Sequence, residues 1–153
     1  MNPQAAQQNY LRTRVLTATP EQLQMMLYDG AIRFADGART ALLKKDWEGV
    51  YKNCSRAQKI VTELSAALKR DVAPDLCHNL GSLYNYIFRQ LMDASLNHTV
   101  ESIDEALKML RYQRDTWAML MEQLGKEKAA GAAAKVSFPE PNPRMEAALS
   151  VQG

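Results

Sequence analysis

Apolar residues recur at the spacing of an α-helix along most of this chain. The rows run over residues 23–38, 47–68, 76–94 and 103–124. This spacing places apolar side chains on one side of a helix, whereas a half-buried strand would alternate apolar and polar residues. We find no alternating stretch and no internal repeat in the sequence. The pattern therefore predicts an all-α fold.

Capping residues and helix breakers divide this pattern into four predicted helices. The first begins at Thr19-Pro20-Glu21-Gln22, where Thr19 and Gln22 can form a capping box, and it ends near Leu43. Asp46 and Thr99 are the expected N-caps of the second and fourth helices, and Pro74 separates the second from the third. Four long helices with short links favour an antiparallel up-down four-helix bundle.

The two ends of the chain differ from this bundle in composition. Residues 1–18 are polar with isolated apolar residues and predict an extended or short helical N-terminal arm. Residues 125–153 contain the low-complexity run KEKAAGAAAK and the breaker-rich PEPNP, and they predict a mobile C-terminal tail. Within this tail, residues 145–149 could form a short turn of helix. The expected organisation is therefore arm 1–18, bundle 19–124 and tail 125–153.

Charge and hydropathy argue against several classes of partner. The net charge of +2 is too small for the electrostatic footprint of a nucleic-acid-binding protein. No apolar run approaches the ~20 residues of a membrane span, so we expect no membrane insertion. The first residues, MNPQAAQQNY, lack the basic and apolar regions of a signal peptide, which favours a cytoplasmic protein.

Residues for catalysis or metal binding are sparse. Asp75 and His78 have the carboxylate-to-histidine spacing of a di-iron motif, but such a site needs two copies of it. The sequence has no glycine-rich phosphate loop. Cys54 and Cys77 lie in apolar helical stretches and are expected to be buried free thiols. We therefore predict neither an enzyme nor a metal or cofactor site.

The first predicted helix carries more apolar surface than one seam requires. Leu23, Met26, Leu27 and Gly30 form the expected core row. A second row lies about a quarter-turn or more away and contains Met25, Tyr28 and Ile32. This second row is either part of a wide core-facing sector or one wall of a groove for a helix of another chain. Gly30 and Gly37 either allow close helix approach or are simply tolerated.

Several residue runs occur in a distinctive order along the chain. The first contains Tyr10, then Val15-Leu16-Thr17-Ala18-Thr19-Pro20-Glu21-Gln22-Leu23, then Met26-Leu27-Tyr28-Asp29-Gly30-Ala31. Later runs include Arg56-Ala57-Gln58-Lys59-Ile60-Val61, Leu83-Tyr84 and Arg114-Asp115. Together they resemble the FliS family, the flagellar secretion chaperones of flagellin, over residues 10–124. Gln113 departs from the family pattern, which usually has an apolar residue at this position.

The resemblance implies a function without catalysis. Family members are antiparallel helical bundles that bind the C-terminal segment of new flagellin, which is disordered when free. Binding prevents premature polymerisation in the cytoplasm and presents flagellin to the flagellar type III export apparatus. Some members dimerise, and an N-terminal arm can occupy part of the client groove. By this resemblance Tyr10 is the arm tyrosine.

Helical periodicity and the resemblance together select candidate partner-binding residues. They are Tyr10, Val15, Met25, Tyr28, Ile60, Leu64, Leu80, Tyr84, Ile87 and Trp117. The expected partners are the flagellin C-terminal segment and the flagellar export apparatus, with a homodimer as a further association. The alternatives are a structural or adaptor bundle acting as a homodimer, and a cofactor-binding bundle.

Overall fold

The computed structural model describes residues 2–69, 71–130 and 143–149. The helices are α1 (Pro3–Thr17), α2 (Pro20–Leu43), α3 (Trp47–Ala66), α4 (Pro74–Asn97), α5 (Val100–Ala129) and α6 (Pro143–Leu149). No strand occurs in the part of the chain that is described. The all-α prediction is confirmed.

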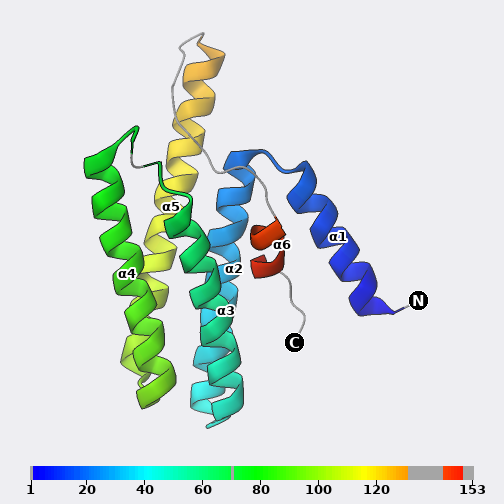
Figure 1. The fold of residues 1–153 in the computed structure, drawn as a ribbon, viewed down its shortest axis with the longest axis vertical. Helices are drawn as coiled ribbons and strands as arrows, with labels where there is room; N and C mark the ends of the chain where they lie inside the picture. Colours follow the sequence, from blue (N-terminus) through cyan, green and yellow to red (C-terminus); the bar gives the residue numbers. More distant parts are fainter. Residues whose placement is uncertain (1, 70, 131–142, 150–153) are drawn as a thin grey trace.

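Four of the helices form the body of the molecule. α2 packs against α3 and α5, and α4 packs against the same two helices, which closes a four-helix ring. Figure 1 shows these four helices side by side, with α1 leaning away and α6 between α1 and α3. The N-terminal arm expected over residues 1–18 is helical through α1, from Pro3 to Thr17.

The predicted caps set the start of α2 and α3. Thr19 Oγ1 accepts a hydrogen bond from Gln22 N at 3.1 Å, and Gln22 Oε1 accepts one from Thr19 N at 3.0 Å. This reciprocal pair is a capping box. Asp46 Oδ1 likewise accepts from Gly49 N at 3.1 Å at the start of α3. Thr99 is the N-cap residue of α5, although its side chain makes no capping hydrogen bond.

The described parts of the predicted tail are helical, and they include the short turn of helix expected at residues 145–149. α5 continues past residue 124 to Ala129, and Pro143–Leu149 form α6. The side chains of Met145, Ala148 and Leu149 in α6 are buried. The rest of the predicted tail, residues 131–142 and 150–153, lies outside the described residues. The apolar spacing of i, i+3 and i+4 in α6 explains why this short segment has one buried side.

α2 is buried on two sides. Its residues are distributed between the core and the flank differently from the prediction. Tyr28 is only 3% exposed and faces α4, while Met26, predicted in the core, is half-buried. Gly30 faces the other way, because a Cβ there would lie 2.8 Å from Leu149 Cδ2 of α6. α2 contacts α3, α5 and α6, so its buried sector is wide. Tyr28 thus belongs to a wide buried sector of α2, and it also forms part of a pocket wall described below.

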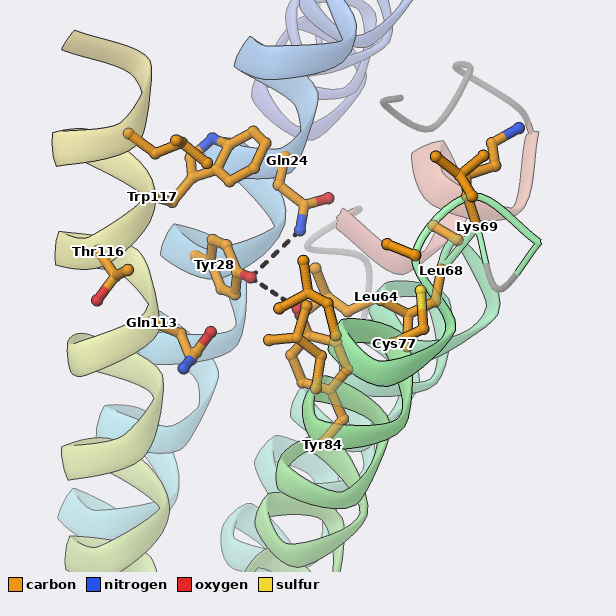
Figure 2. A pocket seen from close by; sticks show the side chains of 16 residues that line it. Gln24, Tyr28, Leu64, Leu68, Lys69, Cys77, Tyr84, Gln113, Thr116 and Trp117 are labelled. Carbon is orange, nitrogen blue, oxygen red and sulfur yellow. Dashed lines mark hydrogen bonds between the residues drawn. The ribbon is translucent and has the colours of Figure 1, made fainter. Parts of the chain in front are cut away.

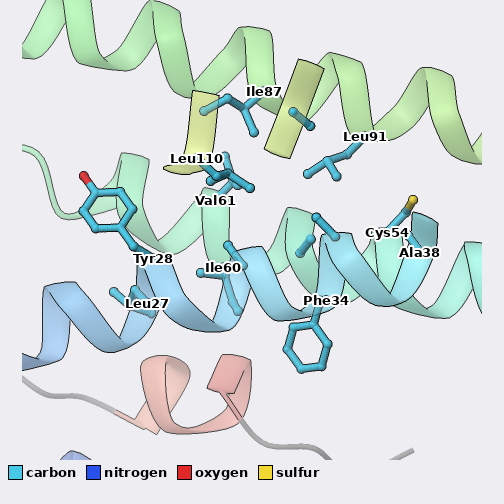
Figure 3. Close-up of a cluster of buried hydrophobic side chains, with 14 of the residues drawn as sticks. Leu27, Tyr28, Phe34, Ala38, Cys54, Ile60, Val61, Ile87, Leu91 and Leu110 are labelled. Atoms are coloured by element: carbon cyan, nitrogen blue, oxygen red, sulfur yellow. The ribbon is translucent and has the colours of Figure 1, made fainter. Parts of the chain in front are cut away.

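The thiols follow the sequence prediction, and the surroundings of Gly37 favour close helix approach, one of the two alternatives left open for the glycines. A Cβ at Gly37 would lie 2.5 Å from Asn53 Oδ1, so this glycine permits close approach of α3. Cys54 and Cys77 are free and buried. Burial raises the pKa of the Cys54 thiol to about 11, so it stays protonated at neutral pH. Cys54 lies in the interhelical cluster with Val61, Ile87 and Leu91 (Figure 3).

Candidate functional site

A pocket of about 360 Å³ opens where α4 and α5 meet the link between α3 and α4. Its walls come from four helices and that link, as Figure 2 shows. The apolar lining residues are Leu64, Ala67, Leu68, Val72, Ala73, Leu76, Leu80, Trp117 and Leu120. The aromatic, polar and sulfur-containing lining residues are Gln24, Tyr28, Lys69, Cys77, Tyr84, Gln113 and Thr116. The pocket has the size and mainly apolar character of a binding site.

Two tyrosines and one amide form a hydrogen-bonded group in the pocket wall. The hydroxyl oxygens of Tyr28 and Tyr84 are 2.7 Å apart, and Gln24 Nε2 donates to the Tyr28 hydroxyl at 3.2 Å. Burial raises the pKa of both tyrosines above the ordinary value, so both hydroxyls are neutral at physiological pH. The group therefore satisfies buried polar atoms in an otherwise apolar wall, and it does not supply a base.

Contacts between α2 and α5 position the Trp117 wall. Trp117 Nε1 donates to the Glu21 carbonyl oxygen at 3.1 Å, which joins the middle of α5 to the first turn of α2. One turn earlier, Arg114 Nε donates to Asp29 Oδ1 at 2.5 Å. These two contacts hold α5 against α2, and both helices contribute residues to the pocket.

The rim of the pocket exposes large apolar side chains. Val72 in the α3–α4 link is 62% exposed, Leu76 on α4 is 58% exposed and Leu120 on α5 is 39% exposed. The walls formed by the link, α4 and α5 thus continue outward as apolar surface. Exposed apolar surface that adjoins a pocket is characteristic of an interaction site.

The structure brings half of the predicted partner-binding residues together. Tyr28, Leu64, Leu80, Tyr84 and Trp117 line the pocket. Their role in binding a partner stays a prediction.

The other five predicted residues lie elsewhere. Ile60, Ile87 and Val15 are 0% exposed in the hydrophobic core, so they present no surface in this arrangement. Tyr10 on α1 is 66% exposed, and Met25 on α2 is half-buried. Helical periodicity did not separate these cases, because it marks a buried side without showing which neighbour covers it.

Several residues that line the pocket were not among the predicted ones. Val72 lies in a link rather than in a periodic row, so helical spacing could not select it. Gln113 departs from the family pattern, and it lines the pocket. A polar residue that interrupts an apolar row was the available signal for this position.

No group of three His, Cys, Asp or Glu residues in the described ranges could hold a metal ion. None of the described helices is long and apolar enough to cross a membrane. The site therefore consists of an apolar pocket, a neutral hydrogen-bonded wall and an exposed apolar rim.

Comparison with known proteins identifies the family. The model of the family described as flagellar protein FliS matches residues 2–124. The chain belongs to the FliS family. The flagellar secretion chaperone FliS of Bacillus subtilis is 31% identical over 127 residues, covering 83% of this chain and 92% of that protein. Its counterpart in Escherichia coli is 29% identical over 115 residues, covering 74% of this chain and 85% of that protein.

A solved structure supports the same fold. The crystal structure of a flagellar chaperone from bacteria superposes with a TM-score of 0.64 at 22% sequence identity. The match covers 78% of this chain and 97% of that chain. The matched family model ends at residue 124, so α6 lies beyond the part of the chain that it describes.

Proposed function

We propose that this FliS-family chain is a cytoplasmic export chaperone for flagellin. It binds the disordered C-terminal segment of flagellin, prevents premature polymerisation and delivers the segment to the flagellar type III export apparatus. The observation that carries this proposal is the apolar pocket between α4 and α5 with its exposed rim. Membership of the flagellar secretion chaperone family supports it.

The pocket supplies what a disordered client requires. Ordering such a segment on binding costs ~2–5 kcal/mol or more of the gross interaction energy. A client helix that places one large apolar side chain in the pocket and others along Val72, Leu76 and Leu120 offsets this cost by burying apolar surface. No bond is made or broken in this role, and the neutral tyrosine pair suits binding alone.

Calorimetry with the full chain and a C-terminal fragment of the cognate flagellin tests the proposal. We expect a 1:1 complex. Leu76→Ser should weaken binding about tenfold, because it removes an apolar side chain at the rim. The matched control is Leu96→Ser, since Leu96 lies on the same helix, is 69% exposed and does not line the pocket. Absence of heat and of co-elution with the wild-type chain would reject the proposal.

The competing hypothesis is a structural or adaptor bundle that acts as a homodimer through its exposed apolar residues. Mass measurement on dilution separates the two. A dimer that persists on dilution, together with no binding of the flagellin fragment, would favour the homodimer hypothesis. A chain that binds the fragment at 1:1 supports the chaperone proposal whether or not it also self-associates.

A further inference from the structure

α6 covers a side of the bundle that is separate from the pocket. It contacts α1, α2 and α3 (Figure 1). No described residue of α6 is among those that line the pocket. Met145, Ala148 and Leu149 of α6 are each no more than 3% exposed, and they follow the i, i+3, i+4 spacing of one helix face. The contact is therefore that of an amphipathic helix docked through its apolar face.

The surface under α6 is shaped to receive a helix. Gly30 gives it a floor without a side chain, where Leu149 Cδ2 and Ile60 Cδ1 converge within 2.8 and 3.1 Å of a hypothetical Cβ. Phe34, one turn further along α2, points to the side of α2 on which α6 lies (Figure 3), and the guanidinium groups of Arg33 and Arg56 lie over its ring. Ile60 and Phe34 are 0% and 4% exposed. Without an occupant, this surface would present apolar side chains to water.

One polar group at this surface is incompletely satisfied. Glu63 of α3 is 6% exposed, and its Oε2 accepts no hydrogen bond from any described residue. Arg144 Nη2 of α6 lies 3.6 Å from that oxygen, close enough for an ion pair but too far for a good hydrogen bond. A buried acceptor without a donor is unfavourable. Another helix with a better-placed basic residue would satisfy Glu63 more fully than α6 does.

α6 itself is a weak occupant. It has only seven residues, and helices of fewer than about 12–15 residues are marginal in water, so its docking must stabilise it. It belongs to the same chain, which raises its effective concentration at this surface. A longer client helix can bury more apolar area on this surface than the seven residues of α6 do. The docking surface itself lies within the family-matched residues 2–124, whereas α6 lies outside them.

We propose that α6 is a displaceable internal occupant of a helix-docking surface formed by α2 and α3. An amphipathic helix of the client takes its place, with apolar residues at i, i+3 and i+4 and a basic residue just before the first of them. This inference rests on the proposed chaperone function, because the displacing helix belongs to the same client. Docked α6 thus keeps the apolar surface covered until a client arrives and lowers the apparent client affinity.

The test compares the full-length wild type with Leu149→Glu, which places a charge in the apolar contact. The matched control is Ala147→Glu, because Ala147 is on the same helix but exposed. If α6 is docked in most molecules, Leu149→Glu should tighten binding of the flagellin C-terminal fragment about 3- to 10-fold, since apparent affinity scales with the open fraction. Ala147→Glu should bind like the wild type. Equal or weaker binding by Leu149→Glu would overturn the inference.

Hydrogen exchange on the wild-type chain gives a second readout that requires no substitution. Amides of residues 145–149 should exchange faster when the flagellin fragment is bound, because displaced α6 loses its helical hydrogen bonds. Unchanged or slower exchange would overturn the inference even if Leu149→Glu fails to fold. Absence of binding by all three chains would instead remove the proposed function and this inference with it.

Discussion

On one side of α2, Tyr28 faces α4 beside an open pocket, and on the other side Gly30 faces α6 in a filled contact. Both sides are apolar and lie within a few residues of each other. The pocket side ends in an exposed rim, including Leu76 at 58% exposure, whereas the α6 side buries Leu149 to 2%. The pocket side of α2 is therefore open at the surface, whereas the other side is covered by part of the chain itself.

The largest expected effect is a loss of stability, and it distinguishes the hydrophobic core from the pocket rim. Leu27 on α2 is 0% exposed, so Leu27→Ala should lower the free energy of unfolding by about 2–5 kcal/mol, measured by denaturant titration. Leu120→Ala at the rim should change stability far less, because Leu120 is 39% exposed, yet it should weaken binding of the flagellin fragment. Equal losses of stability would mean that the rim is part of the core.

The next effect concerns the tyrosine pair on the pocket side. Tyr84→Phe removes one hydroxyl and leaves the Tyr28 hydroxyl with Gln24 alone, so we expect a loss of about 1–2 kcal/mol in unfolding free energy. The exposed Tyr51 is a suitable control for the same substitution, and Tyr51→Phe should leave stability unchanged. No loss for Tyr84→Phe would show that the hydroxyl pair is dispensable.

The buried pair of Tyr28 and Tyr84 also predicts that the stability of the fold depends on pH in the alkaline range. Burial raises the pKa of Tyr84 above its ordinary value of 10.0, so the folded chain keeps a proton that the unfolded chain loses. The unfolded state then binds fewer protons, and stability falls as pH rises through and above about 10. Thermal melts across this range should show a steeper fall for the wild type than for Tyr84→Phe. Parallel curves would contradict this prediction.

A smaller effect tests the filled side of α2. A Cβ added at Gly125 on α5 would meet no neighbouring atom within 4 Å, so Gly125→Ala should raise stability by about 0.5–1 kcal/mol through helix propensity. Gly30→Ala gains the same propensity but crowds Leu149 and Ile60, so its gain should be smaller or reversed. In a Leu149→Ala background, where the crowding is relieved, Gly30→Ala should recover part of the gain relative to Leu149→Ala alone. A full gain for Gly30→Ala alone would show that α6 does not press on Gly30.

Local sequence signals predicted the helices of this fold better than they predicted which helices pack together. The box at Thr19 and Gln22 and the cap at Asp46 depend on neighbouring residues, so the sequence was sufficient for them. The side of α2 that each apolar residue occupies depends on which helices lie next to it. Tyr28 was therefore predicted at the flank but is buried against α4.

The candidate site was predicted only in part for the same physical reason. Tyr84 and Trp117 lie in periodic rows and were selected, but Val72 comes from a link that has no period. The docking of α6 depends on contacts far apart in sequence, such as Leu149 with Gly30. Its apolar spacing was visible in residues 145–149, but the surface that receives it was not.

The smallest expected effect concerns the exposed ion pairs that join α5 to α2 beside the pocket. Arg114 pairs with Asp29 at 2.5 Å, and Arg111 pairs with Asp36 at 2.9 Å, with all four side chains at least 40% exposed. Solvent and salt screen such pairs, so Arg114→Gln should lower the melting temperature only slightly, and the difference should disappear at about 1 M salt. Arg111→Gln is the matched control. If Arg114→Gln alone weakened binding of the flagellin fragment while both variants kept their stability, Arg114 would contribute to the pocket by holding the α5 wall that carries Trp117.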